Sequence, residues 1–396
     1  MASKDETHSG FAPAGAKPPL RRSWREATSS TGDSFVAWPV VVDGIAMAKF
    51  DSGLIAVEAS SGRRVWFRDF AEGHSIGVPA VEGESVFAPL YDGVLVALDL
   101  ADGRELWRFK ADDELEASPT VSGGRIFVNS ARAKTTHCIS AVDGSSCWTR
   151  KLDLEPDTVP AVSQGVVAVV AQSLDEPRIE IYGLSAEDGS ILWSKPHARG
   201  YSSASILDNK VILGGGDFNA HALDLTTGES IWKSPVKGKF GPRNLPALAF
   251  GDVFLADRTG NIYRLDGDTG KQKWIYEVPD EGTFDQSFPV IAGKTLFIGS
   301  GSGWIYALHT ETGRLLWKEQ VGGFVLSGAA DSERFYFGVK FRNEGLYAYE
   351  HDPNGRLEPP PSEPTQQIIA GVLLFAILVG GVWLYGRRRR SADEGP

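Results

Sequence analysis

The chain has 396 residues, of which 42% are apolar, with 45 glycines and 11 tryptophans. This length suffices for one large core or two ordinary domains, and so much glycine without a collagen period indicates many tight turns. The formal charge of −11 argues against nucleic-acid binding, which needs a basic surface. With only two cysteines, Cys138 and Cys147, a disulfide-rich scaffold and a CxxC metal site are excluded.

The first segment, residues 1–21, is polar and has no apolar core like that of a signal peptide. We expect it to be a disordered arm. From residue 22 onward, tryptophan returns every 39 to 45 residues, and from Trp66 each one follows a glycine by four positions. The series consists of Trp24, Trp66, Trp107, Trp148, Trp193, Trp232, Trp274 and Trp317.

Each repeat contains four short apolar runs separated by glycine-containing turns, as residues 289–317 illustrate. Four hairpin-connected strands in about 40 residues are typical of one blade of a β-propeller. The repeated Gly fits a hairpin turn that needs a positive φ, and an Asp four residues earlier, such as Asp266, can bond the backbone of that turn. We therefore interpret the tryptophans as structural wedges between blades.

The last repeat, residues 325–350, supplies three strands and lacks a Trp. Residues 22–26 resemble the outermost (rim) strand of a blade, the strand that carries the repeated tryptophan, and Trp24 precedes Trp66 by one repeat. The sequence therefore predicts an all-β, eight-bladed propeller over residues 22–352, whose last blade is closed by the N-terminal strand. The alternative is a seven-bladed ring with Trp24 outside it.

A proline-rich linker is expected at residues 353–366, followed by an uncharged apolar stretch that predicts a transmembrane helix at 367–386. The basic tail at 387–396 contains four consecutive arginines, which favours a cytoplasmic tail and an exterior (periplasmic or extracellular) propeller. Because the chain shows no signal peptide, a tail-anchored protein with a cytosolic propeller stays the alternative.

The motifs HALDLTTGESIW, YRLDGDTGKQKW and YALHTETGRLLW resemble the pyrroloquinoline-quinone (PQQ) repeat. Two kinds of PQQ-repeat propeller are similar: the quinoprotein alcohol dehydrogenases, and the non-enzymatic propeller lipoprotein of the outer-membrane barrel-assembly machinery. The dehydrogenase resemblance implies adjacent cysteines over the cofactor and a set of calcium ligands. No Cys-Cys pair occurs and no motif carries those ligands over, so we expect no catalytic residue, no cofactor and no metal site.

The two cysteines flank the turn of the third repeat, in HCISAVDGSSCW. The hairpin register that pairs Ser140 with Ser145 places Cys138 opposite Cys147, near disulfide range. Other repeats carry Ala and Leu at these positions, so two buried thiols that act as small apolar side chains are the alternative to a disulfide.

In a four-stranded blade, the short turns lie on one face and the longer connections on the other, where binding residues usually sit. The long connections carry cationic and aromatic side chains, which predict a surface for a protein or peptide partner. Its candidate residues are Arg132, Arg199, Tyr201, Lys239, Arg243, Phe284, Phe324 and Arg342.

The function that we expect is a membrane-anchored scaffold that recognises a protein or peptide without covalent chemistry. Two alternatives stay open: a PQQ-dependent dehydrogenase-like enzyme, and a sensor that binds a carbohydrate or small ligand in the propeller funnel.

Overall fold

The structure is a computed structural model that describes residues 10–27, 38–50, 53–70, 77–90, 92–115, 117–173, 175–197, 202–237, 244–279, 283–284 and 287–358. Residue contacts divide the chain into a unit of residues 1–357 and a unit of residues 358–396, and the first is described here. The described residues form strands and turns, and none of them belongs to a helix able to cross a bilayer. The predicted helix at 367–386 and the basic tail lie outside these ranges.

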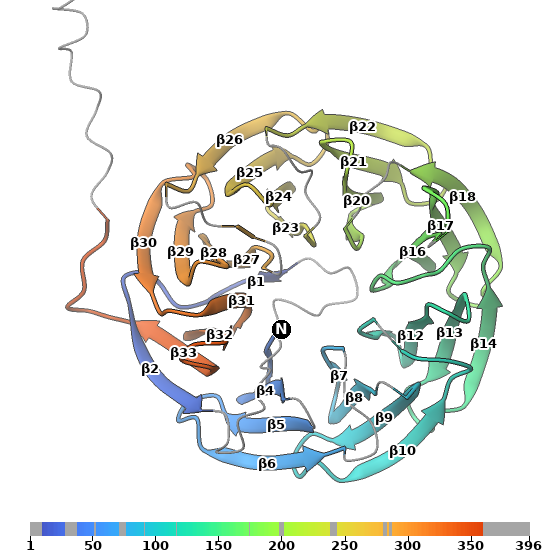
Figure 1. The fold of residues 1–396 in the computed structure, drawn as a ribbon, viewed down its shortest axis with the longest axis horizontal. Helices are drawn as coiled ribbons and strands as arrows, with labels where there is room; N and C mark the ends of the chain where they lie inside the picture. The colour runs from blue at the N-terminus through green and yellow to red at the C-terminus, as the bar shows by residue number, and fades with distance from the viewer. Residues whose placement is uncertain are drawn as a thin grey trace, which may run out of the picture. The chain divides into compact units, whose positions relative to one another are not determined.

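Eight sheets are arranged around one axis as the blades of a propeller (Figure 1), which confirms the predicted eight-bladed propeller. In blades 1 to 7, four consecutive strands run from the axis to the rim. Blade 1 comprises β3 (Val40–Val42), β4 (Ile45–Phe50), β5 (Gly53–Glu58) and β6 (Arg64–Asp69), and blade 2 comprises β7 (Ala80–Glu82), β8 (Ser85–Pro89), β9 (Val94–Asp99) and β10 (Glu105–Lys110). Blade 3 comprises β11 (Thr120–Ser122), β12 (Arg125–Ser130), β13 (Thr135–Ser140) and β14 (Ser146–Lys151), and blade 4 comprises β15 (Ala161–Ser163), β16 (Val166–Gln172), β17 (Ile179–Ser185) and β18 (Ile191–His197). Blade 5 comprises β19 (Ser205–Leu207), β20 (Lys210–Gly215), β21 (Asn219–Asp224) and β22 (Ser230–Pro235). Blade 6 comprises β23 (Ala247–Ala249), β24 (Asp252–Ala256), β25 (Asn261–Asp266) and β26 (Gln272–Glu277). Blade 7 comprises β27 (Val290–Ala292), β28 (Thr295–Gly299), β29 (Trp304–His309) and β30 (Leu315–Gln320).

Blade 8 joins the two ends of the propeller, as predicted. Its inner strands are β31 (Phe324–Ala330), β32 (Arg334–Lys340) and β33 (Gly345–His351), and its rim strand is the N-terminal β2 (Leu20–Ala27). Strand β2 runs antiparallel to β33 and places Trp24 opposite Ala348. The seven-bladed alternative is therefore wrong. Closure removes two sheet edges that would otherwise be open to pairing with other chains.

The N-terminal arm is more ordered than predicted. Strand β1 (Phe11–Ala12) pairs in parallel with β27 and extends blade 7 towards the axis. The amide of Gly293 donates to the carbonyl of Ala12 at 2.9 Å, and Ala12 and Ala16 are buried. The expectation of a disordered arm is thus wrong for residues 10–21, while residues 1–9 lie outside the described residues. The reason is tertiary: the inner strand of a blade offers unpaired backbone groups, and small side chains allow the arm to approach.

The core is divided among the joints between blades. Eight clusters of buried apolar side chains occur in the described residues, each drawn mainly from two neighbouring blades. The cluster between blades 4 and 5, for example, joins Ile181 and Trp193 to Leu213 and Leu225. Each blade is therefore stabilised by the next blade around the ring.

The Gly-x-x-x-Trp repeat builds these joints. Gly270 has a φ of 70°, and a Cβ added there would lie 2.6 Å from Cε3 of Trp232 in the preceding blade. The Trp232 indole also donates to the carbonyl of Gly267 at 3.0 Å. Glycine is required twice, for its backbone conformation and for the space that the indole occupies. The pairs of this kind are Trp24/Gly62, Trp66/Gly103, Trp107/Gly144, Trp148/Gly189, Trp193/Gly228, Trp232/Gly270 and Trp274/Gly313.

Trp317 differs because blade 8 is assembled from two ends of the chain and has no equivalent hairpin turn. Its ring instead meets Tyr349 edge-on, with centroids 5.7 Å apart.

A bulge next to each rim tryptophan shifts the register of the last hairpin. In blade 3, Cys138 lies opposite Trp148, and Ile139 lies opposite Ser146. The predicted direct opposition of Cys138 and Cys147 is therefore wrong, because Cys147 is the extra residue of the bulge.

Candidate functional site

The two faces of the propeller differ in their connections. The short-turn face carries the turns between strands one and two and between strands three and four of each blade. The long-loop face carries the turns between strands two and three and the connections between blades. Of the predicted partner-binding residues, Arg132, Phe284, Phe324 and Arg342 belong to segments of the long-loop face. Arg199, Tyr201, Lys239 and Arg243 lie outside the described residues.

The described cations of this face are largely paired within the fold. Arg132 is exposed in the β12–β13 turn and lies 3.4 Å from a carboxylate oxygen of Glu114. Lys134 in the same turn lies 3.1 Å from Glu155. Because ion pairs at the protein surface contribute little energy, the exposed Arg132 can still exchange partners, but these two cations do not form an unbalanced positive patch.

Phe284 is not a surface residue. Its side chain is fully buried and contacts the ring of Tyr306 edge-on, with centroids 6.4 Å apart. It belongs to the apolar cluster between blades 6 and 7. The expectation that Phe284 helps to form the partner-binding surface is therefore wrong, because burial of the ring in this joint is more favourable than its exposure to water.

Phe324 and Arg342 are brought together with Phe341 at the long-loop end of blade 8. Phe341 is 76% exposed and has a φ of 72°. Its ring meets that of Phe324 edge-on, with centroids 6.4 Å apart, and the adjacent Arg342 is exposed. A bulky residue in the left-handed region is a true outlier, and such outliers concentrate at functional sites. We call Phe324, Phe341 and Arg342 the aromatic corner.

Neighbouring backbone and side chains hold the aromatic corner in place. The Phe341 amide donates to Oε1 of Glu344 at 2.7 Å, and Nδ2 of Asn343 donates to the carbonyl of Val321 at 2.7 Å. Gly323, with a φ of 88°, lies against the backbone of Arg342, where a Cβ would come within 2.2 Å of the Arg342 carbonyl oxygen. The turn is therefore presented on a braced scaffold rather than on a free loop.

A buried lysine lies at the start of this turn. Lys340 ends β32, and burial, together with the positive charge of Lys49 on blade 1, lowers the pKa of Lys340 to about 8. The sequence hints at this position only weakly, through a lysine at the end of the apolar run RFYFGV.

The structure also joins two histidines that appear unrelated in the sequence. The rings of His197 on β18 and His221 on β21 meet edge-on, with centroids 4.5 Å apart. Asp217 accepts from Nε2 of His221 at 3.0 Å and from Lys233 at 2.7 Å. Burial, reinforced by the neighbouring His221, lowers the pKa of His197 to about 4. Sequence reasoning missed this cluster because its members belong to two blades.

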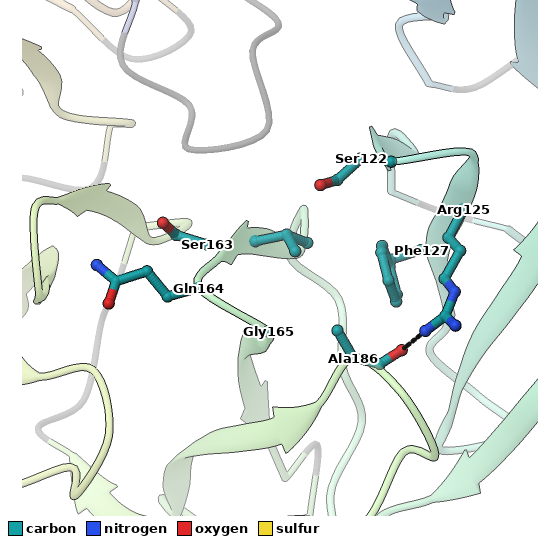
Figure 2. A pocket seen from close by; sticks show the side chains of 9 residues that line it. Ser122, Arg125, Phe127, Ser163, Gln164, Gly165 and Ala186 are labelled. Atoms are coloured by element: carbon teal, nitrogen blue, oxygen red, sulfur yellow. Dashed lines mark hydrogen bonds between the residues drawn. The ribbon is translucent and has the colours of Figure 1, made fainter.

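A pocket of about 290 Å³ opens on the short-turn face between blades 3 and 4 (Figure 2). The Arg125 guanidinium crosses this joint and donates from Nη1 to the carbonyl of Ala186 at 2.8 Å. The amide of Gln164 is likewise bound, to the carbonyl of Asp208 at 3.0 Å. Two of the polar groups of this pocket thus already serve the contacts between blades.

The described residues do not fit the quinone cofactor and calcium ion of the dehydrogenases. No group of three or more His, Cys, Asp or Glu side chains in the described ranges is placed to hold a metal ion. The cysteines lie on the rim hairpin of blade 3, far along the blade from the axis, and are not adjacent in sequence. Strand β1 also takes up the inner edge of blade 7.

Comparison with known proteins places the chain among PQQ-repeat propellers. The outer membrane protein assembly factor BamB of Yersinia pestis is 24% identical over 232 residues, which cover 52% of this chain and 58% of that protein. The chain spans about half the length of the curated relatives that it matches first.

Solved structures share the fold. BamB from Moraxella catarrhalis superposes with a TM-score of 0.67 at 16% identity, covering 84% of this chain and 99% of that one. Quinohemoprotein alcohol dehydrogenase from Comamonas testosteroni superposes with a TM-score of 0.68 at 15% identity, covering 94% and 84%. At such identities the likeness establishes the fold alone.

The family model described as "Outer membrane protein assembly factor BamB" matches residues 50–196, 130–256 and 258–355, which together exceed half of the chain. The protein therefore belongs to the family of PQQ-repeat propellers described as outer membrane protein assembly factor BamB.

Proposed function

We propose that this protein is a non-catalytic, membrane-tethered scaffold that binds a protein or peptide segment through the aromatic corner of its long-loop face. The observation that carries the proposal is Phe341, a large apolar side chain held exposed in a strained backbone conformation. Left-handed backbone costs a residue other than glycine about 1–2 kcal/mol. Phe250 shares this combination of exposure and positive φ. Phe341, however, meets a second phenylalanine, Phe324, next to the exposed Arg342.

The chemistry of the aromatic corner selects the kind of partner. Two phenylalanine rings at nearly right angles form a small apolar surface. The exposed guanidinium of Arg342 next to them can bind a carboxylate with bidentate hydrogen bonds. A peptide segment that carries an apolar side chain close to an acidic one fits this arrangement. Aromatic and arginine side chains are also the residues that most often dominate binding energy at interfaces.

Family membership supports the scaffold role. Four of the curated relatives are described as assembly factors and one, matched over 23% of this chain, as a quinohemoprotein alcohol dehydrogenase. The described residues of this chain offer no set of metal ligands for redox chemistry. The stretch at residues 367–386 would tether the propeller to a bilayer, with the arginines after it in the cytoplasm and the propeller on the exterior side.

Site-specific photo-crosslinking tests the partner-binding face. A photoreactive phenylalanine analogue is placed at position 341, and at position 250 as a matched control. Phe250 is also exposed and has a φ of 57°, but it lies on the short-turn face. We expect a defined partner band at position 341 that is absent at position 250 and is lost in Arg342→Glu. Equal crosslinking at both positions would place the partner elsewhere.

The tether is tested separately. Carbonate extraction of membranes should leave the full chain in the pellet and release a chain that ends at residue 358. Protease added to spheroplasts, whose outer membrane no longer excludes it, should then degrade the propeller if it is on the exterior side. A propeller protected from protease until the spheroplasts are lysed would instead support the tail-anchored, cytosolic arrangement.

A further inference from the structure

The last hairpin of each blade contains a recurring pair of positions. The third strand places a residue opposite the rim tryptophan, and the residue before that tryptophan is the extra residue of the bulge. In blade 2 these are Ala97 and Leu106. In blade 3 both positions are cysteine, Cys138 and Cys147, and these are the only two cysteines of the chain. Both cysteines thus occupy one structurally coupled pair of positions.

The register of the bulge makes the two cysteines neighbours. A bulge sets two residues against one, so Cys147 lies beside Cys138 although Trp148 takes the paired position. Both are free in this structure, with Cys138 buried and Cys147 exposed. Burial, together with the nearby Cys147, raises the pKa of the Cys138 thiol, so the exposed Cys147 is the thiol that reagents reach first.

We propose that Cys138 and Cys147 form a redox site, at which an external disulfide donor closes a bond across the rim hairpin of blade 3. The Cys147 thiolate attacks one sulfur of the donor, which forms a mixed disulfide and releases one thiol. Cys138 then loses its proton and attacks Sγ of Cys147, which releases the second thiol. The protein gives up two electrons and two protons, and the donor disulfide is reduced to two thiols.

The bond would act on the joint between blades 3 and 4. Trp148, which follows Cys147, donates from its indole to the carbonyl of Ala186 in blade 4 at 3.1 Å, and its ring lies 5.9 Å from that of Phe127. A bond between Cys138 and Cys147 fixes the bulge that aims this ring. Oxidation should therefore stabilise the joint as well as close the loop of the hairpin.

The test equilibrates the purified full chain with mixtures of oxidised and reduced glutathione, then denatures it and alkylates it. We expect no alkylated cysteine under oxidising conditions, a mass lower by about 2 Da for the two lost hydrogens, and two alkylated cysteines after dithiothreitol. Two alkylated cysteines at every glutathione ratio would overturn the proposal. So would glutathione retained on Cys147 while Cys138 is alkylated.

A double variant, Cys138→Ala with Cys147→Leu, provides the control, because blade 2 shows that Ala and Leu fit these positions. We expect the oxidised protein to melt about 5 °C above its reduced form. The melting temperature of the variant should not respond to dithiothreitol. An equal response in the variant would show that the effect does not come from this pair.

Discussion

Replacing the repeated glycine at one joint by alanine should destabilise the propeller far more than the same change in a neighbouring turn. Gly270 and Gly251 belong to the same blade and have nearly equal backbone conformations, with φ values of 70° and 73°. They differ in their surroundings. A Cβ at position 270 would lie 2.6 Å from Trp232, whereas a Cβ at position 251 would meet nothing within 4 Å.

The expected magnitudes follow from these distances. Both substitutions place alanine in the left-handed region, which costs about 1–2 kcal/mol of unfolding free energy. At position 270 the new methyl group also lies about 1 Å inside normal contact distance of a buried indole. Overpacking of this kind adds about 1–3 kcal/mol. We therefore expect Gly270→Ala to lower the free energy of unfolding by about 2–5 kcal/mol, and Gly251→Ala by only the smaller backbone amount.

Urea unfolding monitored by tryptophan fluorescence measures both variants, and their difference isolates the clash, because the effect of alanine on the unfolded chain is similar in the two. A third variant that combines Gly270→Ala with Trp232→Leu should relieve part of the clash. Its loss of unfolding free energy should therefore be smaller than the sum of the losses in the two single variants. Equal destabilisation by the two alanines would refute the view that the glycine makes room for the tryptophan.

Three further predictions concern buried charge and the pH dependence of stability. Lys340 has a folded pKa of about 8, below its value of 10.5 in a model peptide, so the unfolded chain binds more protons between these pH values. The free energy of unfolding should thus rise with pH across this range, by on the order of 3 kcal/mol, and Lys340→Met should remove this rise. His197 has a folded pKa of about 4, below its value of 6.5 in a model peptide, so the free energy of unfolding should fall as the pH drops from 6.5 towards 4. His197→Leu should flatten that slope, and an unchanged slope would show that other groups cause it. Asp252 is buried and lies 2.5 Å from both Arg264 and Lys273, so Asp252→Asn should cost about 3–5 kcal/mol in urea unfolding, whereas Asp268→Asn, at an exposed pair, should cost less than about 1 kcal/mol.

The ring could be predicted from the sequence because its determinants are local and repeated. A glycine with positive φ, followed four residues later by a tryptophan, marks the same hairpin in each of blades 1 to 7, and an aspartate caps that turn in blades 2, 5 and 6. Asp266, for example, accepts from the amide of Thr269 at 2.9 Å. Closure by Trp24 followed from the same spacing. A single motif of this kind would be weak evidence, but seven copies at one period indicate a propeller.

The departures from prediction all depend on tertiary contacts. The arm around Ala12 carries no strand pattern of its own and becomes ordered only because β27 offers a free edge. Phe284 lies in a loop, where sequence does not reveal which way a ring turns. His197 and His221 meet because two blades are adjacent, and the relation of Cys138 to Cys147 depends on a bulge of one residue.

The closure of blade 8 has a consequence for biosynthesis. The ion pair between Arg21 and Glu350 joins residues 329 positions apart, so β2 emerges from the ribosome long before β33 is made. Until then, Trp24 and the backbone of β2 have no sheet to join, and such an open edge invites pairing with other nascent chains. Strand β2 is translated early but is thus among the last strands to pair, and a chaperone that shields it should matter most during that interval.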